Sequence, residues 1–234
     1  MIPVLIIWLM RRYRQRRHPA QKIQSDLKNL KRQLPSIVAA LLAALMLLIT
    51  VMSHAQNRQF KYQIVRNGNK VGTLDFSETT DGGVDHLKMV SDVKTRFIFT
   101  FTAHANEEAV YRNGILLHSS IYRKLNGNEK VNKQHLAQNN QYIIRAGNNT
   151  EITKNYPITY SMLSLYSKEP ENINKVYSDN FETFLIIQKV DGHKYKITLP
   201  DGNYNYYCYK EGVLNLVEIH HSLYSANIVL TNNN

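Results

Sequence analysis

The segment Val93-Lys94-Thr95-Arg96-Phe97-Ile98-Phe99-Thr100-Phe101-Thr102-Ala103-His104-Ala105 carries the pattern that decides the fold class. Apolar side chains stand at residues 93, 97, 99, 101, 103 and 105, and Lys94, Arg96, Thr100, Thr102 and His104 share the other parity. Period-two alternation places the two sets on opposite faces of an extended chain. The pattern therefore predicts β-strand structure with one apolar face, on which Phe97, Phe99 and Phe101 form a stripe.

Turn dipeptides interrupt similar short segments throughout the rest of the chain. Asn and Gly tolerate the positive φ angles of tight hairpin turns. About ten to twelve antiparallel strands in one domain suggest closure or strong curvature. We therefore predict an all-β fold, an antiparallel meander forming a barrel-like or strongly curved sheet. The turn dipeptides are Asn67-Gly68, Asp81-Gly82, Asn113-Gly114, Asn126-Gly127, Gly147-Asn148, Asp191-Gly192, Asp201-Gly202 and Glu211-Gly212.

The Asn113-Gly114 turn raises a question of register. A two-residue hairpin there places Arg112 opposite Ile115 and Val110 opposite Leu117. The apolar residues after the turn then share a face with Thr100 and His104 rather than with the phenylalanines. A single core requires a change of parity, and we expect a bulge near Asn106; the alternative is a sheet buried on both sides.

Residues 158–167 interrupt the meander. Tyr160-Ser161-Met162-Leu163-Ser164-Leu165-Tyr166 follows Pro157 and precedes Glu169-Pro170. We expect a short helix or loop that plugs one end of the curved sheet.

The net charge of +11 is concentrated before an apolar run. Residues 1–36 hold nine basic residues and one acid, whereas residues 56–234 have a net charge of only +3. Basic residues that precede an apolar run favour membrane targeting over nucleic-acid binding, because the remainder of the chain is nearly balanced in charge. We therefore expect no nucleic-acid partner. The 43% hydrophobic content and the one cysteine argue against a disordered or disulfide-rich chain.

The apolar run Ile37–Met52 contains no charged residue, follows Lys28, Lys31 and Arg32, and precedes Ser53-His54-Ala55. This order is typical of a secretory signal helix cleaved after Ala55. An uncleaved membrane anchor is the alternative, and residues 56–234 are exported under both hypotheses. We divide the chain into a basic extension at 1–33, which an over-long gene start would also explain, a signal peptide or membrane segment at 34–55, and one exported β domain at 56–234.

Motifs for catalysis, metals and cofactors are absent from the sequence. The seven histidines of residues 56–234 form no His-x-His or His-Glu-x-x-His arrangement. Glu107 and Glu108 face apart on a strand, and Glu108 reads as a solvated or ion-paired residue. Cys208 stands among tyrosines, where a small buried residue is expected. We therefore predict no catalytic residue, no metal site and no cofactor.

Several sequence pieces, in order and spacing, resemble a family of uncharacterised exported β-rich proteins of Bacteroidota that is known as a domain of unknown function. The resemblance spans most of Phe60 to Leu230 and implies an antiparallel barrel-like fold and an envelope location, but no activity. The pieces are Asn67-Gly68 with Gly72-Thr73-Leu74 and Phe76, Ser91-Asp92-Val93-Lys94, Tyr122-Arg123 with Asn126-Gly127, Met162-Leu163-Ser164-Leu165-Tyr166 with Glu169-Pro170, and Leu199-Pro200-Asp201-Gly202-Asn203 with Tyr206 and Tyr209.

The favoured function is a non-enzymatic binding module for an apolar or amphipathic envelope ligand, or for a protein partner. Aromatic side chains can line a cavity or a rim, although core and cross-strand packing is the simpler explanation of most of them. The alternatives are a hydrolase acting on an envelope polymer and a structural or assembly factor. The predicted ligand-binding residues are Phe97, Phe99, Phe101, Tyr160, Tyr166 and Arg123.

Overall fold

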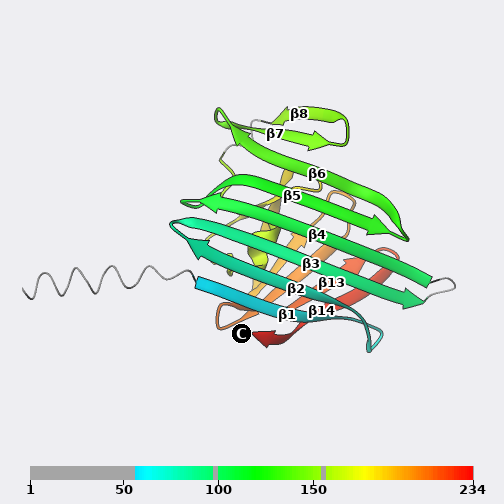
Figure 1. Ribbon diagram of the computed structural model, residues 1–234. Coiled ribbons are helices and arrows are strands. Elements are labelled where there is room, and N and C mark those ends of the chain that lie inside the picture. Colours follow the sequence, from blue (N-terminus) through cyan, green and yellow to red (C-terminus); the bar gives the residue numbers. More distant parts are fainter. Residues whose placement is uncertain (1–55, 97–99, 154–156, 234) are drawn as a thin grey trace, which may run out of the picture. The chain divides into compact units, whose positions relative to one another are not determined.

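The computed structural model describes residues 56–96, 100–153 and 157–233, which form fourteen strands and one 3-10 helix (Figure 1). The extension and the signal segment predicted within residues 1–55 lie outside the described residues. No helix of the described residues is long and apolar enough to cross a membrane. The elements are β1 (Gln56–Arg66), β2 (Asn69–Asp81), β3 (Val84–Arg96), β4 (Thr100–Arg112), β5 (Ile115–Leu125), β6 (Asn128–Gln138), β7 (Gln141–Ala146), β8 (Asn149–Thr153), η1 (Met162–Tyr166), β9 (Lys175–Ser178), β10 (Thr183–Asp191), β11 (Lys194–Thr198), β12 (Tyr204–Lys210), β13 (Val213–His221) and β14 (Tyr224–Asn233).

All fourteen strands belong to one antiparallel sheet, which confirms the predicted meander. The order is β8-β7-β6-β5-β4-β3-β2-β1-β14-β13-β12-β11-β10-β9, so the first and last strands of the chain pair at its middle. The sheet is not closed, because β8 and β9 are its two ends. It folds over on itself, and Figure 1 shows the first layer, β1–β8, crossing in front of the second layer, β9–β14.

The segment that first indicated strand structure is a hairpin rather than one strand. β3 ends at Arg96, β4 begins at Thr100, and Val93 pairs with Ala103. The two predicted faces survive the reversal, because paired residues of antiparallel strands point to the same side. Phe97 and Phe99 lie outside the described residues.

The parity change occurs at a different place from the one predicted. Asn113 has φ of 51° and Gly114 of 75°, and the two-residue turn sets Arg112 opposite Ile115 as expected. A register shift between Val110 and Tyr111 then places Val110 opposite His118, so the predicted pairing with Leu117 is wrong. Asn106 pairs regularly with Tyr122, so the bulge predicted there is also wrong. The extra residue beside the turn brings Tyr111, Leu116 and Ile121 to one buried face.

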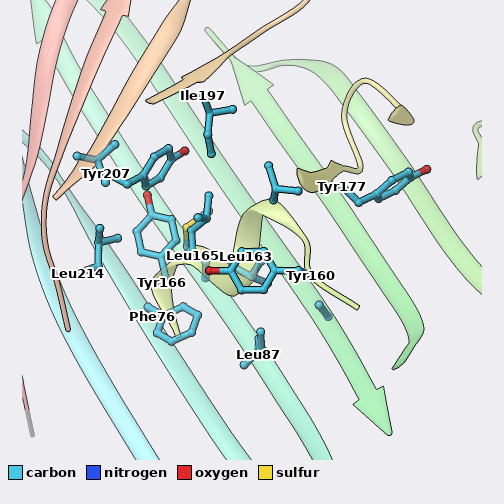
Figure 2. Packing of buried hydrophobic residues seen from close by; sticks show 14 of the residues in the cluster. Phe76, Leu87, Tyr160, Leu163, Leu165, Tyr166, Tyr177, Ile197, Tyr207 and Leu214 are labelled. Atoms are coloured by element: carbon cyan, nitrogen blue, oxygen red, sulfur yellow. The ribbon is translucent and has the colours of Figure 1, made fainter. Parts of the chain in front are cut away.

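The predicted plug is the helix η1, and it lies in the core. It contacts β3 and β4 of the first layer and β9 and β13 of the second. Figure 2 shows Leu163, Leu165 and Tyr166 between Phe76 and Leu87 on one side and Tyr207 and Leu214 on the other. Because the plug fills the space between the layers, the core is built from the inner faces of both layers and from η1 together.

The two layers differ in strand length. β2, β3 and β4 each have 13 residues, whereas β11, β12 and β13 have five, seven and nine. A 13-residue strand is about 44 Å long, and a seven-residue strand about 24 Å. The long strands therefore extend beyond the part of the inner face that the second layer and the plug cover.

Candidate functional site

The inner face of β3, β4 and β5 is covered only in part. Leu87, Met89, Ala109 and Tyr111 are buried, but the inner-face residues nearer the β3–β4 hairpin are half-buried. We call this region the half-covered end and define it by Val93, Phe101, Ala103, Ala105 and Arg123. Its pairs are Val93 with Ala103 and Ala105 with Arg123, so these residues lie on neighbouring strands of one face.

An ion pair between Arg123 and Glu107 lies at the border between the half-covered end and the core. The Arg123 Nη2 and Nε atoms donate to Glu107 Oε1 over 2.6 and 3.2 Å. The side chain of Arg123 is 39% exposed and that of Glu107 is 12% exposed. A guanidinium has five N–H donors, and these two bonds use two of them. The exposed part of Arg123 can therefore donate to an anionic group that approaches along the inner face.

The six predicted site residues separate into three groups. Phe101 and Arg123 both belong to the half-covered end, where Arg123 pairs with Ala105, four residues along β4 from Phe101. Phe97 and Phe99 fall outside the described residues. Tyr160 and Tyr166 are 2% and 9% exposed in the core, where Tyr166 lies over Phe76 at 5.8 Å between ring centroids. Burial raises the pKa of both tyrosines above the ordinary value. The ligand role of these residues stays a prediction.

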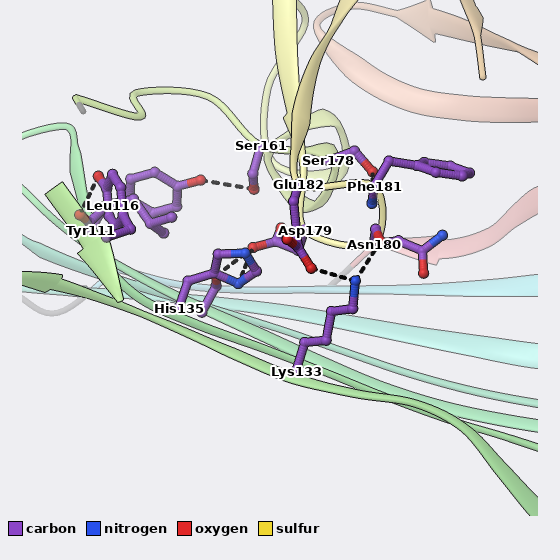
Figure 3. Close-up of polar contacts among 12 residues, drawn as sticks. Tyr111, Leu116, Lys133, His135, Ser161, Ser178, Asp179, Asn180, Phe181 and Glu182 are labelled. Atoms are coloured by element: carbon purple, nitrogen blue, oxygen red, sulfur yellow. Dashed lines mark hydrogen bonds and ion pairs between the residues drawn. The ribbon is translucent and has the colours of Figure 1, made fainter. Parts of the chain in front are cut away.

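A polar cluster that the sequence analysis missed lies against the inner face of the first layer, at β5 and β6 (Figure 3). Ser119 on β5 and His135 on β6 are cross-strand partners, and both meet Asp179 from the turn after β9. Ser119 Oγ donates to Asp179 Oδ1, and His135 Nδ1 lies 3.4 Å from the same oxygen. Lys133 bonds the carbonyl oxygen of Asn180 at 3.0 Å and pairs with Glu182.

This cluster contains the serine, histidine and aspartate of a serine hydrolase. It has neither the geometry of a catalytic triad nor a surface that a substrate could reach. A catalytic serine gives its proton to a histidine, which the carboxylate orients from the other side. Here the serine hydroxyl bonds the carboxylate, and Ser119 and His135 are 1% and 0% exposed. The cluster instead ties residues 178–182 to β5 and β6, on the side of the sheet where β8 and β9 do not pair.

Burial changes the protonation of this cluster. It raises the pKa of Asp179 from 3.8 to about 6 and lowers that of His135 from 6.5 to about 4. As the pH falls from 6 to 4, folded Asp179 takes a proton more readily than the unfolded chain, which stabilises the fold. Over nearly the same pH window, His135 takes a proton more readily in the unfolded chain than in the folded protein, which destabilises the fold. The two contributions oppose each other.

We therefore expect single substitutions to reveal opposite pH dependences. Relative to the unmodified protein, Asp179→Asn should lose about 2 kcal/mol of stability as the pH falls from 6.5 to 4, because the stabilising protonation of Asp179 is removed. His135→Gln should gain about the same amount relative to the unmodified protein over this window, because the destabilising protonation of His135 is removed. Urea unfolding at a series of pH values measures both. Identical pH profiles for the two variants would contradict the assignment.

Other polar residues have structural partners. Glu108 pairs with Lys88 at 2.7 Å, which confirms the ion-paired interpretation. Cys208 is half-buried, and burial raises the pKa of its thiol. Glu169, Glu171 and His193 bring donor atoms within 4.8 Å of one another, a set that could hold a cation. Glu169 already accepts bonds from Tyr195 Oη at 2.7 Å and His193 Nδ1 at 2.9 Å, which join its loop to the β10–β11 hairpin.

Comparison with known proteins agrees with this architecture. A family described as a domain of unknown function, DUF6134, matches residues 62–231. The chain belongs to this family. The DUF6134 domain thus runs from β1 to β14 and includes the half-covered end, which confirms the expected membership of a domain-of-unknown-function family. The Bacteroidota source stays a prediction.

A solved structure shares the fold of this DUF6134 protein. It is a β-barrel-like protein of the domain of unknown function DUF1849 from Brucella abortus, 9% identical, with a TM-score of 0.50. The match covers 76% of this chain and 97% of that one. At this identity the likeness concerns the fold alone. None of the curated proteins matches this chain.

Proposed function

We propose that this DUF6134 protein is a non-enzymatic binding module that holds an amphipathic molecule with an anionic group at the half-covered end. The observation that carries the proposal is the row of half-buried small and apolar side chains on the same face as a partly exposed Arg123. Val93, Phe101 and Ala103 would contact the apolar part. Burying apolar surface there contributes about 25 cal/mol per Å².

Small side chains support the proposal further. Ala103 and Ala105 occupy positions where the alternation calls for core residues, and both are half-buried with short side chains. A charged guanidinium at the border of the core can fix the orientation of a carboxylate or phosphate. The half-covered end thus combines an apolar surface with one polar anchor, which is the common composition of a small-molecule site.

We also propose that residues 56–234 act outside the inner membrane, in the periplasm or as a secreted protein. The basic, apolar and small-residue order of residues 28–55 supports export. N-terminal sequencing of the protein recovered from the envelope distinguishes cleavage after Ala55 from a retained anchor. A membrane association through the retained segment is the alternative.

Ala103→Trp is expected to weaken binding of a fluorescent long-chain fatty acid by at least about tenfold, because the indole would cover the surface that Val93, Phe101 and Ala103 offer to the apolar chain. Titration followed by the fluorescence of the probe measures the effect. Thr100→Trp is the matched control, since it adds the same ring to the same strand at an exposed position of the opposite parity. Equal loss in both variants, or no binding by the unmodified protein, would refute the proposal.

A further inference from the structure

The outer face of the same strands contains an open groove of about 560 Å³. A row of paired residues, Thr73, Asp92, His104 and Lys124, runs across β2, β3, β4 and β5 through this groove. These residues alternate with Leu74, Val93 and Ala103, so their side chains point away from the core. The volume lies in the range of small-molecule sites.

Three lysines line the groove: Lys70 at the start of β2, Lys94 near the end of β3 and Lys124 near the end of β5. The one acid in the lining, Asp92, bonds His104, with 2.8 Å between Oδ1 and Nδ1. Within the described residues, Lys70 and Lys94 form no ion pair. The groove therefore presents an excess of positive charge, although the folded domain as a whole is nearly balanced.

The lining chemistry suits one class of ligand. Lysine binds phosphate as a mobile point charge, and the hydroxyls of Thr73 and Thr102 supply neutral donors beside it. Three cations on three strands match a phosphate monoester, which carries almost two negative charges at neutral pH, or several neighbouring headgroups of an anionic surface, better than they match a single carboxylate. The arrangement is also independent of Arg123, which lies on the opposite face of the sheet.

We infer that this groove binds a phosphate ester, either the headgroup of an anionic lipid or a soluble phosphorylated molecule. Lys70, Lys94 and Lys124 hold the phosphate, and the one acid of the lining, Asp92, is engaged by His104. The inference does not depend on the proposed function, because a phosphate ester can bind the outer face whether or not an apolar molecule binds the inner one.

The test measures binding of two probes to the full chain. One probe is glycerol 1-phosphate, followed by calorimetry, and the other is vesicles of phosphatidylcholine with roughly one third phosphatidylglycerol, followed by cosedimentation. Each lysine near an anionic surface contributes about fivefold in affinity, so Lys70→Gln/Lys94→Gln is expected to lose about 25-fold. Added salt should weaken binding of either probe.

Lys61→Gln/Lys210→Gln is the matched control, because it removes the same charge from two exposed positions outside the groove. The N-terminal segment is common to every variant, so only a difference between the groove variant and the control variant is assigned to the groove, and glycerol 1-phosphate tests the groove without a membrane. Loss of either probe in the groove variant alone supports the site, and the probe that binds identifies the source of the phosphate. Equal loss in the control variant, or no binding of either probe, would overturn the inference.

Discussion

Leu165→Ala is expected to lower the free energy of unfolding by about 3 kcal/mol. Leu165 lies in η1, is 0% exposed and belongs to the cluster that joins both layers. Removing its side chain leaves a cavity between two sheet layers, and hydrogen-bonded strands cannot easily move inward to fill it. Urea-induced unfolding followed by circular dichroism measures the change.

Leu223→Ala is the matched control for this substitution. Leu223 is 83% exposed, so the same truncation there should change stability by no more than about 0.5 kcal/mol. If the two variants were equally stable, η1 would be a peripheral loop. The space that it occupies would then be available to a ligand, and Tyr160 and Tyr166 would again be candidates for a cavity wall.

Gly72→Ala is expected to destabilise the fold by about 2–3 kcal/mol. A Cβ atom at Gly72 would lie 2.2 Å from the backbone oxygen of Asp92 and 3.0 Å from Cα of Val93. Both neighbours are main-chain atoms of β3, so β2 and β3 would have to separate locally. The same unfolding measurement detects the loss, and amide hydrogen exchange should increase first in β2 and β3.

Gly192→Ala tests whether the effect at Gly72 comes from steric contact. An added Cβ at Gly192 meets no atom within 4 Å, so we expect a change within about 0.5 kcal/mol. A Gly72→Ala protein as stable as Gly192→Ala would show that β2 and β3 have freedom to part. It would also mean that the groove and the half-covered end, which both lie near this contact, are deformable.

The strands and most turns were predictable because they depend on neighbouring residues. Alternation and the Asn-Gly pairs correctly predicted the hairpin at Asn113-Gly114, where Arg112 pairs with Ile115. The reversal between Arg96 and Thr100 was missed because the intervening Phe97-Ile98-Phe99 contains no Gly, Pro, Asn or Asp, and Phe97 and Phe99 keep the parity of Val93 and Phe101. When odd-numbered residues face the same side on both strands of a hairpin, its alternation is the same as that of one long strand.

The candidate sites were less predictable. Phe101 and Arg123 were proposed as ligand-binding residues from residue type. Their place at the half-covered end depends on the different strand lengths of the two layers. Ser119 and Asp179 are 60 residues apart in the chain, and no local pattern predicts that they meet. The parity of Ser119 and His135 relative to the apolar residues was a usable signal, because both positions are inward-facing on their strands.

The sequence by itself determined that the chain forms an antiparallel β meander with a plug, because turn preference and alternation act between residues close in the chain. Only the tertiary structure decided where the bulge lies, which tyrosines pack in the core and which lysines gather in one groove. These outcomes depend on burial and on cross-strand pairing. Their energies come from contacts between distant residues, so the same local pattern can serve a core, a rim or a groove.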